Sequence, residues 1–162
     1  MDESWTPLIA THALGATVAV LLGAVMLLRR TKGDLLHRRI GRLWMVDMYW
    51  VALSSFGIRR LNPGHFSWIH LLSLWTIFSL SMALRAARAH RVREHRQWAV
   101  GSYCGLVGAG VAAAAFPTRL VPQTVVHHPL WLVGGLLVAT LVAAVAVELA
   151  ASSLDPEPAA HT

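Results

Sequence analysis

Two pairs of histidines recur at the same spacing in this chain of 162 residues. His12 and His70, here called the outer pair, are 58 positions apart, as are His37 and His95, the inner pair. Imidazole is a common axial ligand of haem iron, and helix bundles often hold cofactors between facing helices. The pattern therefore indicates two haem b sites, one per pair, and one-electron chemistry.

The same four histidines also fit roles without a cofactor. The outer pair would then be interfacial residues that are hydrogen-bonded to helix neighbours, and the inner pair ordinary members of basic loops. Ionisable residues inside a membrane mark functional sites by default. This favours a ligand role for the outer pair over the inner pair, which precedes the apolar stretches.

Charged residues near these histidines suggest supporting roles. Arg38, Arg39 and Arg96 follow the inner pair, and guanidinium suits haem propionates or lipid phosphates. Asp47 lies well inside an apolar stretch, where a charge costs about 2.5–3.5 kcal/mol, so it should face the bundle interior. It would handle protons or orient a histidine, unless it only fixes helix packing.

Five apolar stretches must position these residues, in a chain that is 56% hydrophobic and 14% charged. A membrane-spanning helix needs about 20 apolar residues. The second stretch is short and is expected to begin earlier, near Arg38 or Arg39. The sequence predicts an all-α polytopic transmembrane helix bundle. The stretches are Leu8–Leu28, Leu43–Ile58, Phe66–Leu84, Trp98–Phe116 and Pro129–Ala151.

The histidine spacing divides this bundle into two parallel helical-hairpin repeats. In a bundle wound in sequence order, the first and third helices are diagonal, as are the second and fourth. The appended fifth helix would cover the bundle or dock a larger membrane complex. We predict a single transmembrane domain over 1–151, with repeats at about 7–58 and 65–116, the appended helix at 129–151 and a disordered tail at 152–162.

Lysine and arginine alternate between the loops, with six in 29–42, two in 59–65, five in 85–97 and one in 117–128. The positive-inside rule then predicts a membrane protein with its N-terminus outside and its C-terminus cytoplasmic. In a bacterium this membrane would be the inner membrane. The formal net charge of +6 is explained by this topology. The bilayer is the expected partner, and nucleic acid is not.

Small residues and loop histidines give two weaker predictions. Gly15 and Gly23 suit close helix packing, as do Gly101 and Gly105 in the fourth stretch, which is predicted to be tightly packed. The loop histidines lack a metal-ligand spacing, so a metal or quinone site there is disfavoured. These histidines are His65, His127 and His128.

Several motifs resemble a bacterial family known only as predicted membrane proteins of unknown function, over about residues 8–120. More remotely, the paired histidines resemble dihaem cytochromes b of the ascorbate-reductase type. That resemblance implies haem b on both pairs, although ligands there lie within the spans and the inner pair here precedes them. The motifs are His12-x-x-Gly15 with Gly23, the His37-Arg-Arg-Ile-Gly-Arg42 run, His95-Arg-Gln-Trp98 and Arg119.

Together these features favour a b-type haem protein that carries electrons across the membrane, with a quinone or redox protein as partner. If the chain is an enzyme, it is a membrane oxidoreductase, although no catalytic residue is identified. A cofactor-free accessory subunit is the alternative, and a small proton- or metal-handling transporter is a third.

Overall fold

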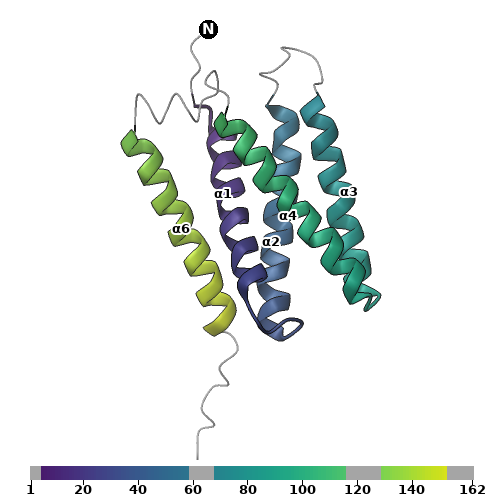
Figure 1. The fold of residues 1–162 in the computed structure, drawn as a ribbon. Coiled ribbons are helices and arrows are strands. Elements are labelled where there is room, and N and C mark those ends of the chain that lie inside the picture. Colours follow the sequence, from purple (N-terminus) through teal and green to yellow (C-terminus); the bar gives the residue numbers. More distant parts are fainter. Residues whose placement is uncertain (1–4, 59–67, 116–128, 153–162) are drawn as a thin grey trace, which may run out of the picture.

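A computed structural model describes residues 5–58, 68–115 and 129–152, and these residues form a bundle of long helices (Figure 1). The described part contains no strand, which confirms the all-α prediction. A short 3-10 turn, η1 (Ser55–Gly57), extends the second helix. The helices are α1 (Pro7–Leu28), α2 (Leu35–Ser54), α3 (Trp68–Arg88), α4 (Val92–Ala115) and α6 (Pro129–Ser152).

The first four helices close a ring in which α1 packs on α2, α2 on α3, α3 on α4 and α4 on α1. Helices α1 and α3 are therefore diagonal, as are α2 and α4. The appended helix α6 packs on α1 and α2 and covers that side of the ring (Figure 1). The connections 29–34 and 89–91 lie at the same end of the bundle, called here the basic end because residues 29–42 and 85–97 carry most of the arginines.

Local capping chemistry sets where the helices begin. Thr6 accepts from the backbone N–H of Ile9, and Pro7 occupies the first turn of α1, where a missing N–H costs nothing. The carboxylate of Asp34 accepts from the N–H of His37 and starts α2 at Leu35. Pro129 begins α6, as predicted. The cap at Asp34 corrects the expected start of the second helix near Arg38 or Arg39.

The observed first residues of α2 and α4 also correct the expected position of the inner pair. His37 lies in the first turn of α2, and His95 is the fourth residue of α4. Both were expected to precede their helices, because the apolar stretches begin several residues later. The first turns extend these helices beyond their apolar parts. Both histidines therefore stand on helical backbone.

Four helices of the described residues are long and apolar enough to cross a membrane: α1, α3, α4 and α6. Helix α2 has a similar length but carries Arg38, Arg39, Arg42 and Asp47. It lies between α1 and α3 and buries Ile40, Trp44 and Met48. Neighbouring helices thus cover much of the most polar helix, as the cost of charge in a bilayer requires.

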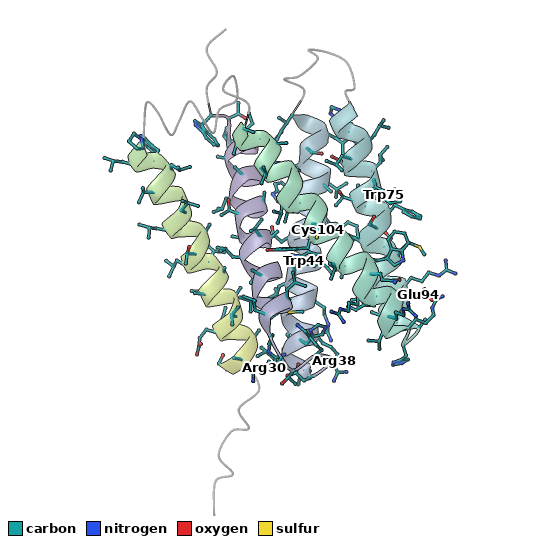
Figure 2. All side chains as sticks on the ribbon, in the orientation of Figure 1. Arg30, Arg38, Trp44, Trp75, Glu94 and Cys104 are labelled. Carbon is teal, nitrogen blue, oxygen red and sulfur yellow. The ribbon has the colours of Figure 1, made fainter. Side chains whose placement is uncertain are left out.

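The core lies where α1 and α2 meet α3 and α6. Its largest fully buried side chains are Leu22, Ile40, Met48 and Leu80. Trp44 crosses this interface, and its indole N–H donates to the carbonyl of Ala19 at 2.9 Å. Figure 2 shows Trp44 inside the bundle, whereas Trp75 lies on the outer side of α3.

The two predictions of close glycine packing have opposite outcomes. At Gly15 and Gly23 an added Cβ would lie within 3 Å of neighbouring side chains, so close packing is confirmed there. At Gly101 and Gly105 nothing lies within 4 Å of such a Cβ. The tight packing predicted for α4 is wrong, because its small-residue face points away from the other described helices.

The cap at Asp34 predicts a pH dependence. Its carboxylate also binds Arg29 through two hydrogen bonds of 2.6 Å, and that guanidinium holds the pKa of Asp34 well below its usual range. A depressed folded-state pKa contributes stability that is complete above the unfolded pKa of about 3.9 and declines as pH falls below it.

We therefore expect the stability difference between the native protein and Asp34→Asn to shrink as pH is lowered from 6 to about 3. Asparagine keeps the N-cap, so the variant isolates the charge, and the effect should be modest for so exposed a pair. Unfolding in detergent, followed by circular dichroism, measures it. A difference that stays constant over this pH range would contradict the prediction.

Candidate functional site

The structure brings the inner pair together at the basic end. His37 projects from α2 and His95 from the diagonal helix α4, and their ring centroids are 6.4 Å apart with planes at 82°. Both helices begin at the basic end, and each histidine lies in the first turn of its helix. The two imidazoles therefore lie at the same level of the bundle. Diagonal helices are the arrangement in which two ligands face each other across a bundle.

Each imidazole of the inner pair is in a condition that suits a ligand. His95 contacts the carbonyl of Ala83 through Nδ1 at 3.0 Å, and an Nδ1–H donated to a carbonyl makes Nε2 the free, basic nitrogen. His37 Nδ1 is buried and has no hydrogen-bond partner among the described residues. Such an orphaned atom marks a place where a further partner would be favourable.

The surroundings of His37 favour the neutral form of its imidazole. Burial lowers the pKa of His37, and repulsion from His95 and Lys32 adds to this effect. A histidine whose pKa is lowered from its ordinary range is neutral near pH 7, and only the neutral ring coordinates a metal.

These residues fit haem better than they fit a bare metal ion. His37 and His95 lie close enough, with ring centroids 6.4 Å apart, that both would hold one haem. No cluster of three or more His, Cys, Asp or Glu side chains suited to a metal exists in the described ranges. Haem supplies its own equatorial ligands and needs only two axial ones.

Arginines surround the inner pair in two different states. Arg38 and Arg96 are exposed and free to reach carboxylates, and Figure 2 shows Arg38 at the basic end. Arg39 instead donates to the carbonyl of Ala150 at the end of α6, at 3.3 Å. Two of the three predicted propionate or lipid contacts are thus available, while the third also anchors the fifth helix.

The outer pair lies at the opposite end, where each histidine contacts the end of α2. His12 Nδ1 is 2.9 Å from the hydroxyl of Ser54. The His70 ring, only 4% exposed, lies 5.6 Å from the ring of Phe56. Residues 54–56 therefore contact both histidines. Within the described part of the chain, the rings of His12 and His70 make no contact like that of the inner pair.

Asp47 occupies the α1–α2 interface, as expected for an acid within the bundle. Its Oδ1 would lie 2.9 Å from a Cβ added to Gly15, so the glycine makes room for the carboxylate. Its Oδ2 is buried and has no hydrogen-bond partner within the described part of the chain. A carboxyl in this position can hold or release a proton.

Hydroxyl groups near the outer pair were missed by sequence reasoning. Ser55 and Ser73 share a buried hydrogen bond of 2.6 Å, next to Ser54 and its contact with His12. Isolated serines are common in membrane helices, so composition alone gave no signal. The pairing of Ser54 and Ser55 at a helix end was the available clue, since side-chain hydroxyls there satisfy free backbone carbonyls.

Other histidines of the sequence contribute nothing to this site. The loop residues His65, His127 and His128, with Arg119, lie outside the described residues. His90 is exposed and occupies the α3–α4 turn with a positive φ of 56°.

Comparison with known proteins agrees with the membrane architecture. A family described as "Predicted membrane protein (DUF2306)" matches residues 9–149, which takes in nearly all of the five helices. No curated protein and no solved structure matches the chain. Because the match covers most of the sequence and confirms the resemblance noted in its motifs, the chain belongs to this family of predicted membrane proteins.

Proposed function

We propose that this membrane protein binds haem b and carries electrons, and that His37 and His95 would hold its first haem. The observation that supports this most strongly is the 6.4 Å approach of these two imidazoles from diagonal helices. Haem, when bound, supplies the one-electron redox couple. The chain would supply two imidazole ligands, a carbonyl that orients His95, and arginines for the propionates.

This proposal favours the inner pair over the outer pair as haem ligands. Sequence reasoning favoured the outer pair, because His12 and His70 lie inside apolar stretches. The contacts favour the inner pair, because each outer histidine packs against residues 54–56 instead. The outer pair is proposed as a second haem site, which transfer across the whole membrane would require.

Asp47 and the partners complete the proposal. Asp47 would exchange protons during electron transfer, since its Oδ2 is buried with no hydrogen-bond partner in the described part. A quinone of the bilayer or a redox protein would be the electron partner. The basic end is proposed to face the cytoplasm of a bacterial cell, because loops rich in arginine stay on that side.

A reduced-minus-oxidised visible spectrum of the detergent-purified protein, expressed with ample haem supply, tests the proposal. We expect a sharp α-band of b type, and haem quantified per chain would give a ratio of one or two. A colourless, well-folded preparation would overturn the haem proposal. It would favour the cofactor-free accessory subunit, in which the contacts of His12 and His70 are structural.

A further inference from the structure

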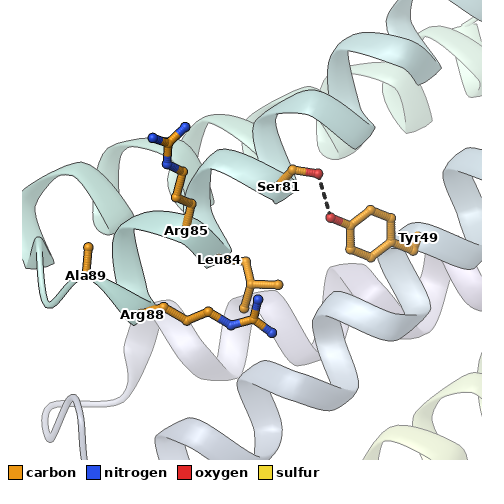
Figure 3. A pocket seen from close by; sticks show the side chains of 6 residues that line it. All are labelled: Tyr49, Ser81, Leu84, Arg85, Arg88 and Ala89. Carbon is orange, nitrogen blue, oxygen red and sulfur yellow. Dashed lines mark hydrogen bonds between the residues drawn. The ribbon is translucent and has the colours of Figure 1, made fainter.

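An open groove lies between α2 and α3 toward the basic end, separate from the four paired histidines. Its volume is about 480 Å³, and Figure 3 shows the six side chains that line it. Arg85 and Arg88 stand at its α3 side, and the Tyr49 hydroxyl meets that of Ser81 at 2.8 Å. The remaining lining residues are Leu84 and Ala89.

The groove carries positive charge that no acid among the described residues neutralises. Arg85 and Arg88 are three residues apart and share one face of α3, and both are exposed. No acid is among the lining residues. Within the described ranges the ion pairs are Arg29–Asp34 and Arg91–Glu94, and neither includes a groove residue.

The hydroxyl pair gives the groove a fixed polar floor. Ser81 donates to the carbonyl of Ile77 at 2.8 Å, so the Tyr49 hydroxyl is the donor in its bond with Ser81. The bond also ties α2 to α3 beside the arginines.

The position of the groove indicates the source of its ligand. Ser81 and Arg88 are seven residues apart, about 10 Å along the helix, and the arginines occupy the last turn of α3. Apolar spans end at the headgroup region, where basic pockets between membrane helices bind anionic lipid heads. Leu84 lies between floor and arginines and offers an apolar contact for an acyl chain.

We propose that this groove is a binding site for an anionic phospholipid, whose phosphate is held by Arg85 and Arg88. Guanidinium groups bind phosphate oxygens through charge-assisted hydrogen bonds. The bond between Tyr49 and Ser81 holds α2 against α3 beside the bound lipid. The site is independent of haem binding and shares no residue with the inner or outer pair.

The test measures lipid binding to the purified full chain by native mass spectrometry, with phosphatidylglycerol, phosphatidylcholine or inorganic phosphate added. The variant is Arg85→Gln with Arg88→Gln. The matched control is Arg30→Gln with Arg93→Gln, which removes the same charge from exposed positions at the same end.

We expect phosphatidylglycerol to bind the native protein in preference to phosphatidylcholine. Each arginine near a membrane surface adds about fivefold to anion affinity, so the double groove variant should bind roughly thirty-fold more weakly. The control should bind nearly as well as the native chain.

Three outcomes would overturn the proposal. Equal losses in groove variant and control would show diffuse attraction to the basic end. Equal binding of phosphatidylcholine and phosphatidylglycerol would remove the requirement for an anion. Displacement of lipid by millimolar inorganic phosphate would make the groove a site for free phosphate. If the double variant misfolds, the single variants Arg85→Gln and Arg88→Gln carry the same test.

Discussion

His95→Ala is expected to remove the haem of the inner pair, and with it that haem's share of the b-type α-band that we predict for the native protein. The substitution removes one of the two imidazoles that we propose to hold the haem, whose ring centroids are 6.4 Å apart. Loss of even a residue that supports a metal ligand costs about 10- to 100-fold in metal affinity, so loss of the ligand itself should cost at least that much. Reduced-minus-oxidised spectra and haem per chain measure it.

The controls for this experiment come from the same chain. His90→Asn changes an exposed histidine in the α3–α4 turn and leaves the inner pair intact; asparagine tolerates its positive φ. Added imidazole should restore the band of His95→Ala by filling the vacated position. An unchanged spectrum in both His95→Ala and His37→Ala would exclude the inner pair as ligands. An α-band that is lost only in His12→Ala and His70→Ala would show that haem binds the outer pair instead.

Gly23→Ala is expected to destabilise the bundle by about 1–2 kcal/mol. The added Cβ would lie 2.4 Å and 2.5 Å from two ring carbons of Tyr103, and 3.1 Å from the indole nitrogen of Trp44. Trp44 cannot retreat without losing its bond to Ala19. Overpacking costs about 1–3 kcal/mol, and the better helix propensity of alanine offsets up to about 1 kcal/mol of that.

Gly105→Ala is the matched control, because nothing lies within 4 Å of an added Cβ there. It should leave stability unchanged or raise it by up to about 1 kcal/mol. Unfolding by SDS titration from mild detergent compares the two. In a double-mutant cycle, Tyr103→Ala should relieve much of the penalty at Gly23. Equal stability of the two glycine variants would refute the close contact between α1 and α4.

Much of the fold was predictable because it depends on properties that are local in sequence. Apolar length indicates helices that cross a membrane, since a bilayer leaves no other partner for backbone groups. Pro129 marks the start of α6 because proline suits a first turn. The burial of Asp47 against α1 was likewise expected, since an acid in an apolar stretch must avoid lipid.

Features that depend on partner helices were harder to predict. Gly23 and Gly105 look alike in sequence, yet one faces Tyr103 and the other faces no described helix. The start of α2 depended on a carboxylate that caps the helix and also binds Arg29. The groove at Arg85 and Arg88 exists only because Tyr49 of α2 lies opposite them.

The sequence by itself determined the class of protein and the all-α architecture, and it supplied the candidate residues for a cofactor site. Hydropathy and residue chemistry carry that information one helix at a time. Only the tertiary structure decided which candidates meet. The orientation of each helix about its own axis places His37 next to His95. His12 instead contacts Ser54 at the end of α2, and His70 contacts Phe56 of η1. Rotation is set by side-chain packing between helices, which no single helix encodes.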